Sequence, residues 1–189
     1  MKKQQEKKQI RSQYLQRRAS FSEQQVTMKS RAVLEHLKSF EPIGRVVFIH
    51  CYLSIADRGE IDTFDVIGWL LTENKKVAVP KSDFKTKNMQ HYLISNLESL
   101  TKNHLGIPEP AGGVEISDDQ LDLIIVPMVA ADSNKNRLGY GEGFYDRFLA
   151  RTNAVKIGLV YENCLMEDPL PVEEFDISMD YLVTEKRIL

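Results

Sequence analysis

Apolar residues along this chain occur in short continuous runs separated by stretches of helical spacing. Val46, Val47, Phe48 and Ile49 follow one another directly, as in a strand that is covered on both faces. Strands are predicted at Arg45 to Leu53, Lys76 to Pro80, Gln90 to Ile94, Leu121 to Pro127 and Val155 to Tyr161. Since such strands belong to sheets layered by helices, the predicted fold is α/β. We expect a single three-layer α/β/α domain over residues 1–189, with a mostly parallel central sheet.

Helical segments lie before and between these strands. The basic stretch Lys2 to Arg18 is predicted to be helical, and a second helix is predicted to begin at Glu23. Ser22 and Gln25 have the spacing of a capping box there. Its buried stripe and the flanking staple are formed by Phe21, Val26, Val33, Leu34 and Leu37.

A third helix is predicted between the first two strands. Apolar residues recur at helical spacing from Phe64 to Leu71, after a cap at Asp62 or Thr63, which predicts a β-α-β unit. Prolines and glycines dominate residues 107–113, and we expect an extended loop there that could line a pocket.

Composition excludes several classes of protein. A net charge of −2 argues against a general nucleic-acid binder, and the longest apolar run, Leu123 to Ala131, is too short to cross a membrane. Cys51 and Cys164 lie far apart, and the polar N-terminus lacks a secretory signal, so a reducing cytoplasm is predicted. Cys51 is interpreted as a buried strand residue. The histidines show no metal-ligand spacing and are assigned no catalytic role: His36, His50, His91 and His104.

The stretch from Arg137 to Phe148 carries the strongest functional signal. Gly139, Gly141 and Gly143 alternate there, so the backbone can take positive φ and bring its N–H groups close to an anion. The apolar spacing that follows predicts a helix whose first amides also attract phosphate. The pattern is neither a dinucleotide fingerprint nor a P-loop. A flexible turn with packed phenylalanines therefore remains an alternative.

Asp146 follows this loop closely. A carboxylate beside phosphates is unfavourable unless a divalent cation lies between them, so Asp146 is a candidate magnesium ligand.

The segment Arg137-Leu138-Gly139-Tyr140-Gly141-Glu142-Gly143-Phe144-Tyr145-Asp146 resembles the glycine signature of the 5-formyltetrahydrofolate cyclo-ligase family, also called methenyltetrahydrofolate synthetase. Other segments resemble the family in the same order along the chain: Lys7 to Arg11, Tyr52-Leu53-Ser54, Glu60-Ile61-Asp62-Thr63, Ile107 to Pro110, Asp176 and Asp180.

The resemblance implies a monomeric α/β enzyme with small-molecule substrates. It would use ATP as co-substrate and Mg²⁺ to convert 5-formyltetrahydrofolate into 5,10-methenyltetrahydrofolate, releasing ADP and phosphate. No nucleic-acid or membrane partner is expected.

The resemblance also implies roles for individual residues. Arg137 would stabilise the transferring phosphoryl group, and Asp146 and Asp176 would hold magnesium. ATP would be bound by Lys7, Arg11, Arg137, Leu138, Gly139, Tyr140, Gly141, Glu142, Gly143, Phe144 and Tyr145. The folate would be bound by Leu53, Glu60 and Tyr140.

Each role has a plainer alternative. Lys7 and Arg11 could form a solvated or membrane-surface basic face, Arg137 a surface salt bridge, and Asp176 a terminal cap. Glu142 places a negative charge near the expected phosphates, and the turn at residues 57–59 could displace Glu60. The rival functions are a non-catalytic nucleotide-binding regulator, or a sugar-phosphate or CoA-handling enzyme on a related scaffold.

Overall fold

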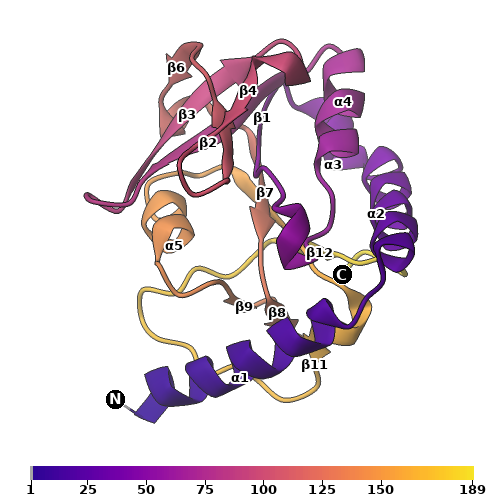
Figure 1. The fold of residues 1–189 in the computed structure, drawn as a ribbon, viewed down its shortest axis with the longest axis vertical. Coiled ribbons are helices and arrows are strands. Elements are labelled where there is room, and N and C mark those ends of the chain that lie inside the picture. Colours follow the sequence, from indigo (N-terminus) through magenta and orange to yellow (C-terminus); the bar gives the residue numbers. More distant parts are fainter. Residues whose placement is uncertain (1) are drawn as a thin grey trace.

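The computed structural model describes residues 2–189 and is organised around one seven-stranded sheet. The strand order is β12-β10-β7-β1-β2-β3-β6. The pairs from β12 to β2 are parallel, whereas β3 and β6 add to one edge in antiparallel fashion. Helices α2, α3 and α4 lie on one side of this sheet and α5 on the other (Figure 1). The predicted α/β/α fold with a mostly parallel sheet is confirmed.

The helices are α1 (Lys2–Ala19), α2 (Glu23–Lys38), α3 (Glu41–Arg45), α4 (Phe64–Thr72) and α5 (Phe144–Leu149). The strands of the main sheet are β1 (Phe48–Cys51), β2 (Lys76–Asp83), β3 (Asn88–Ile94), β6 (Val114–Ile116), β7 (Leu123–Pro127), β10 (Val155–Leu159) and β12 (Tyr181–Val183). Smaller sheets contain β4 (Leu100–Lys102), β5 (Pro108–Pro110), β8 (Ala130–Asp132), β9 (Arg137–Leu138) and β11 (Leu165–Met166).

Local sequence signals account for several helix starts. Helix α2 begins at Glu23 with both hydrogen bonds of the Ser22–Gln25 capping box, as predicted. At α4, the Asp62 carboxylate accepts a hydrogen bond from the Phe64 N–H at 2.9 Å, while Thr63 occupies the N-cap position. The unit β1-α4-β2 is the predicted β-α-β unit, because β1 and β2 are parallel neighbours.

The main core lies along the central strands. Ile49, Leu123, Ile125 and Ile157 are fully buried on β1, β7 and β10. Burying each of these side chains contributes ~1.5–3 kcal/mol to stability. Cys51 is also fully buried, as predicted, and burial raises the pKa of its thiol. The rigid centre of the sheet therefore fixes the carboxyl ends of these parallel strands relative to one another.

The prediction for residues 107–113 was wrong in part. Pro108–Pro110 forms strand β5, which pairs with β4 in antiparallel fashion. Proline lacks an N–H but keeps its carbonyl, so a short outer strand tolerates it. The sequence also gave no signal for β12, whose three residues are too few to show a period.

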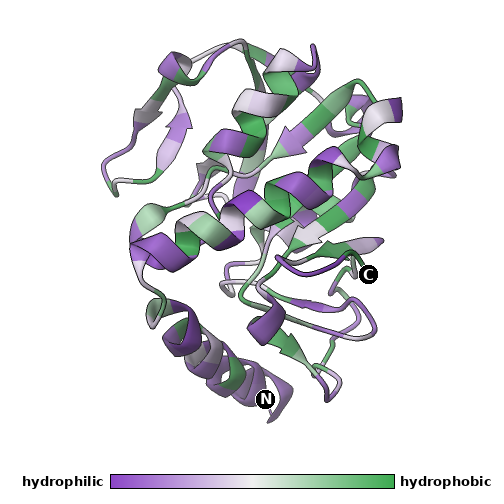
Figure 2. Cartoon of the chain, turned by 90° about the vertical axis from the view of Figure 1, so that its right-hand side faces the viewer, coloured by the Kyte–Doolittle hydropathy of each residue, from purple (hydrophilic) through white to green (hydrophobic). Residues whose placement is uncertain are grey.

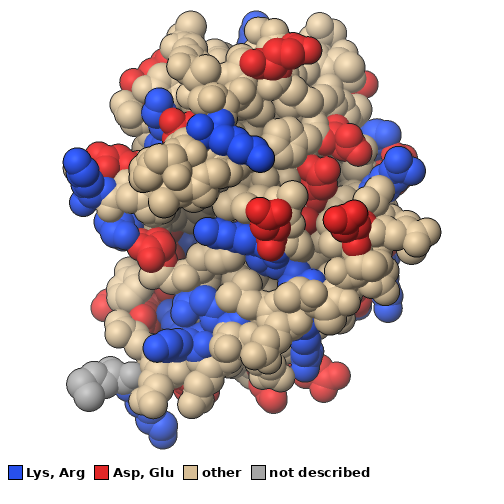
Figure 3. All heavy atoms as spheres, in the orientation of Figure 1, with Lys and Arg blue, Asp and Glu red and all other residues tan. Residues whose placement is uncertain are grey.

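Helix α1 stands apart in character from the rest of the fold. Figure 2 shows it as largely hydrophilic, and only Tyr14 and Arg18 are buried within it. It packs on the segments that follow the carboxyl ends of the strands. On the face drawn in Figure 3, Lys and Arg side chains gather in the lower part, where Figure 1 places α1.

Candidate active site

The glycine-rich loop follows a short hairpin that a buried aspartate holds in place. Strands β8 and β9 pair in antiparallel fashion, and the fully buried Asp132 ends the first of them. Its carboxylate accepts hydrogen bonds from the Asn136 backbone and side chain, both at 2.9 Å, and from the Leu170 N–H at 2.8 Å. Asp132 thus fixes the base from which Arg137 and the loop extend, a role that the sequence reasoning missed.

The backbone of the loop has the freedom that its glycines suggest. Gly141 and Gly143 have φ values of +96° and +69°, and Gly143 leads directly into α5, as predicted. A Cβ on Gly141 would lie 3.1 Å from Cζ of Arg11, so the loop and α1 approach closely at this point. Gly139 does not have positive φ, so only two of the three glycines use that freedom.

Arg11 reaches the loop from α1. Its Nε donates a hydrogen bond to the Gly139 carbonyl oxygen at 2.7 Å. Burial lowers the pKa of the Arg11 guanidinium from its ordinary value, because part of its hydration is lost. A partly desolvated cation beside an amide-rich loop favours an anionic ligand.

Arg137 and Asp146 lie together at the start and end of the loop. Nη2 of Arg137 is 2.5 Å from Oδ1 of Asp146, and the Arg137 side chain is only 4% exposed. Nε of Arg137 is buried and has no hydrogen-bond partner among residues 2–189. The predicted phosphate ligand and the predicted metal ligand therefore neutralise each other in this structure.

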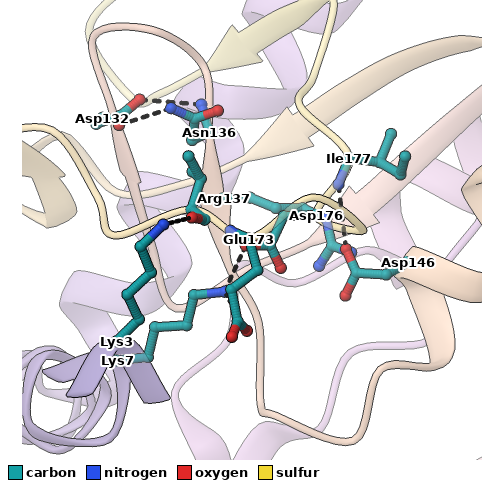
Figure 4. Close-up of polar contacts among 10 residues, drawn as sticks. Lys3, Lys7, Asp132, Asn136, Arg137, Asp146, Glu173, Asp176 and Ile177 are labelled. Carbon is teal, nitrogen blue, oxygen red and sulfur yellow. Dashed lines mark hydrogen bonds and ion pairs between the residues drawn. The ribbon is translucent and has the colours of Figure 1, made fainter. Parts of the chain in front are cut away.

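Lys7 and Asp176 form a second ion pair close by. Lys7 pairs with Asp176 and, at 3.4 Å, with Glu173. The following residue, Ile177, donates its N–H to Asp146 at 3.4 Å, so the segments with Asp146 and Asp176 are adjacent (Figure 4). Within the described chain, no group of three His, Cys, Asp or Glu residues has a metal-binding arrangement. Two carboxylates still suit Mg²⁺, which usually takes one or two of them together with phosphate oxygens.

Glu142 is directed toward the hairpin between β2 and β3. It pairs with Lys87, and the hydrogen bond and charge of that lysine lower the pKa of the Glu142 carboxyl. Arg147 bridges the same contact by donating to the carbonyl oxygens of Lys87 and Glu142. The ring of Phe144 packs edge-on against Phe84 of this hairpin, with 5.3 Å between centroids. The negative charge of Glu142 is thus compensated locally.

Glu60 lies at the other end of the site, at a relay of polar groups. Its carboxylate accepts hydrogen bonds from the Ile55 N–H, at 2.7 Å, and from the Tyr140 hydroxyl. Tyr140 in turn accepts a hydrogen bond from Arg18. Burial, and then the charge of Glu60, raise the pKa of the Tyr140 hydroxyl, which stays protonated. These hydrogen bonds join the glycine-rich loop to Glu60, which is predicted to bind folate.

A small cavity adjoins this relay at the carboxyl ends of the strands. Its lining includes Glu60, Arg18, Pro127, Met128 and Leu159. The volume of this cavity is on the order of one water molecule. Leu53, the third predicted folate contact beside Glu60 and Tyr140, is buried two residues beyond the end of β1.

The aromatic side of the loop packs into the sheet. The hydroxyl of Tyr145 is buried without a hydrogen-bond partner in the part of the chain that is described, and burial raises its pKa. Below it, His50 and His91 pack edge-on with 4.9 Å between ring centroids, and His50 also contacts Phe148. Leu138 is buried before the loop. These residues support the loop from beneath.

Arg18 was not singled out by the sequence reasoning, although a signal was present. Lys7, Arg11 and Arg18 are spaced by four and seven residues, which places all three on one face of α1. The sequence did not distinguish Arg18, which is buried, from the other basic residues of that helix.

These features define an α/β protein with a glycine-rich loop, flanked by Arg11 and Arg137, at the carboxyl ends of its parallel strands. The sequence profile of the 5-formyltetrahydrofolate cyclo-ligase family matches residues 3–185. The chain belongs to this family.

Individual relatives support the assignment. The 5-formyltetrahydrofolate cyclo-ligases of Escherichia coli strain K12 and Haemophilus influenzae are each 32% identical to this chain. The first match covers 91% of this chain and 96% of the relative, and the second covers 95% and 98%. The solved structure of Aquifex aeolicus 5,10-methenyltetrahydrofolate synthetase has a TM-score of 0.85 and 32% identity, covering 96% of this chain and 91% of that one.

Among residues 2–189, no helix is both long and apolar enough to cross a membrane.

Proposed function

We propose that this chain catalyses the ATP- and Mg²⁺-dependent cyclisation of 5-formyltetrahydrofolate to 5,10-methenyltetrahydrofolate, with release of ADP and phosphate. The observation that carries the proposal is the convergence of Arg11, from α1, and Arg137, from β9, around the glycine-rich loop. Family membership and the nearby Glu60 support a folate as the second substrate.

The chemistry requires activation of a poor electrophile. The formyl oxygen attacks the γ-phosphorus of ATP, the bond from that phosphorus to the bridging oxygen breaks, and ADP leaves. N10 then attacks the carbon of the resulting imidate phosphate and loses its proton. Expulsion of phosphate by cleavage of the carbon–oxygen bond leaves the conjugated methenyl bridge. The protein has to align these groups and stabilise the phosphoryl charge.

The basic side chains would bind the nucleotide. Arg11 and the loop backbone from Leu138 to Tyr145 would hold the triphosphate, and Lys7 would exchange Asp176 for a phosphate oxygen. Arg137 would stabilise the transferring phosphoryl group after leaving Asp146. Each charge-assisted hydrogen bond of this kind is worth ~1.5–3 kcal/mol.

Asp146 and Asp176 would hold Mg²⁺, because they lie on neighbouring segments and carboxylate oxygens suit this ion. When bound, Mg²⁺ neutralises charge on the phosphate oxygens. Both carboxylates are paired with cations in the structure, so ligand binding exchanges one set of ion pairs for another.

Glu60 would accept hydrogen bonds from the amino and ring N–H groups of the pterin. A carboxylate has about four acceptor positions, and two of the Glu60 positions are taken by Ile55 and Tyr140. The adjoining cavity is smaller than a pterin ring, so the site must widen on binding. Met128 lines it with a flexible side chain that can move.

We also propose that the enzyme acts as a monomer in the cytoplasm. The regulator alternative predicts nucleotide binding without turnover. The sugar-phosphate and CoA alternatives predict no folate-dependent use of ATP.

The test is to add 5-formyltetrahydrofolate, ATP and Mg²⁺ to the purified protein and follow the near-ultraviolet absorbance of the conjugated product. The proposal requires absorbance that grows with time and needs all three additions. Omitting each component in turn, and adding a chelator, provide the controls. A folded protein that binds ATP but gives no product would support the regulator instead.

A further inference from the structure

Arg18 is a charged residue that is almost completely buried, with 3% of its surface exposed. Its guanidinium donates three hydrogen bonds: Nε to the Arg58 carbonyl oxygen at 2.8 Å, Nη1 to the Met128 carbonyl oxygen at 3.3 Å, and Nη2 to the Tyr140 hydroxyl. Burying a charge is costly unless it is paired. Glu60 supplies the negative charge, through the shared Tyr140 hydroxyl.

The first of these hydrogen bonds fixes the turn that leads into Glu60. Residues 56–58 form a single 3₁₀ turn that ends at Gly59, which has a φ of +58°. A Cβ on Gly59 would lie 3.3 Å from the Arg18 carbonyl oxygen, so backbone and side chain of Arg18 both contact the turn. Tyr161 donates to the Gly59 carbonyl oxygen at 3.2 Å. Arg18 and Tyr161 thus hold in place the turn at residues 57–59, which the sequence left able to displace Glu60.

The other two hydrogen bonds fix the surroundings of the carboxylate. Met128 follows the end of β7, and Tyr140 belongs to the glycine-rich loop. Two guanidinium groups lie near the Tyr140 ring, with centroid distances of 5.4 Å to Arg18 and 5.1 Å to Arg58. Arg18 thus joins three separate segments around Glu60.

We propose that Arg18 is a positioning residue for the folate site, which holds the residue 56–59 turn and the Tyr140 hydroxyl so that Glu60 presents its remaining acceptor positions to the pterin. This inference rests on the proposed function, in which Glu60 binds the pterin. Among the described residues, Arg18 contacts the glycine-rich loop through Tyr140, by its hydroxyl and its ring, whereas it holds Glu60 from two sides. Its loss therefore acts on folate binding more than on ATP binding.

The experiment compares steady-state kinetics of the wild type with Arg18→Met and Arg18→Lys. Arg17→Met is the matched control, because Arg17 also donates to a carbonyl oxygen, that of Asn163, but from the exposed face of α1. Arg18→Met is expected to raise the KM for 5-formyltetrahydrofolate roughly tenfold or more, as loss of charge-assisted hydrogen bonds implies. kcat and the KM for ATP stay within about twofold, and Arg17→Met behaves as the wild type.

Arg18→Lys keeps the charge but not the three-way geometry, so its folate KM falls between the wild type and Arg18→Met. If Arg18→Met does not fold, Tyr140→Phe provides the second variant, since it removes only the hydroxyl that links Arg18 to Glu60. It should then raise the folate KM and leave the ATP KM unchanged. The inference is overturned if the folded variants keep a normal folate KM, or if kcat and both KM values change together.

Glu60→Gln separates this inference from the proposed function. If Glu60→Gln raises the folate KM and Arg18→Met does not, only the role of Arg18 is lost. If Glu60→Gln has no effect on the folate KM, the assignment of Glu60 fails, and the role of Arg18 fails with it.

Discussion

Arg137 and Asp146 occupy the two ends of the glycine-rich loop and are joined by an ion pair of 2.5 Å between Nη2 and Oδ1. In the proposed function each has a different ligand, the phosphoryl group for Arg137 and Mg²⁺ for Asp146. The pair neutralises an arginine whose side chain is only 4% exposed, and in the proposed function nucleotide and metal would replace it. Two variants separate these roles.

Arg137→Met retains the stem of the side chain and removes the guanidinium. Turnover is expected to fall roughly 100-fold or more, because one donor that stabilises developing charge is lost. Arg151→Met is the control, since Arg151 also pairs with an aspartate, Asp118 at 2.7 Å, but is 45% exposed. Thermal unfolding of both variants is measured alongside turnover. Losses of activity and stability that run in proportion for Arg137→Met would contradict a catalytic role.

Asp146→Asn keeps the shape of the side chain and an oxygen that can accept the Ile177 N–H. The concentration of Mg²⁺ needed for half-maximal turnover should rise roughly tenfold or more, because a neutral amide is a poorer ligand than a carboxylate. Turnover should recover in part at high Mg²⁺. Asp168→Asn, at an exposed position, serves as the comparison. An unchanged Mg²⁺ requirement in a folded Asp146→Asn enzyme would exclude Asp146 as a ligand.

Glu142 is 54% exposed and paired with Lys87, and exposed pairs of this kind contribute ~0–1 kcal/mol to stability. Glu142→Gln removes a negative charge near the proposed triphosphate and frees Lys87. The KM for ATP is therefore expected to fall a few-fold, with a larger change at low salt. Lys87→Met should change it in the opposite direction. A higher KM for ATP in Glu142→Gln would show that Glu142 supports the nucleotide.

The buried pair His50 and His91 predicts a loss of stability in acid. Burial lowers the pKa of His50 well below its ordinary value, and the nearby His91 adds to this shift. The unfolded chain therefore binds a proton near pH 6.5 that folded His50 does not bind, and stability falls as the pH drops through that value. From pH 7.5 to 5.5 the loss is on the order of 1 kcal/mol for this histidine.

His50→Leu should lack this part of the acid sensitivity. Urea unfolding of the wild type and the variant at both pH values gives the difference, in which acid effects common to both proteins cancel. If both proteins lose the same free energy of unfolding, His50 is not the source. His36→Gln, outside the core, should retain the acid sensitivity of the wild type.

The elements that the sequence predicted well are those with strong local signals. The capping box at Ser22 and the run from Val46 to Ile49 depend on neighbouring residues, and they gave α2 and β1. The strand begins only at Phe48, and Val47 before it is 52% exposed. β5 was missed because its pairing with β4 is set by tertiary contacts that outweigh the proline content. β12 depends in the same way on its neighbour β10.

The residues of the candidate site likewise divide into those with a local sequence signal and those whose contacts depend on the fold. The glycine-rich loop could be identified because its residues are consecutive. Asp146 could be identified because it follows the loop closely in the sequence. The helical spacing placed Arg18 on the face of Lys7 and Arg11, but its partner Tyr140 lies far away along the chain. Asp132 has a nearby partner in Asn136, but its contact with Leu170 depends on the fold. The ion pair between Arg137 and Asp146 could not be predicted either, because a spacing of nine residues across a turn has no fixed geometry.

The proposed transfer of phosphate to the formyl oxygen can be measured directly. 5-Formyltetrahydrofolate carrying heavy-isotope oxygen in its formyl group is converted with ATP and Mg²⁺ by the purified protein, and the released phosphate is analysed by mass spectrometry. The account predicts one labelled oxygen in the phosphate for each molecule of product formed. Product formation with unlabelled phosphate would contradict it.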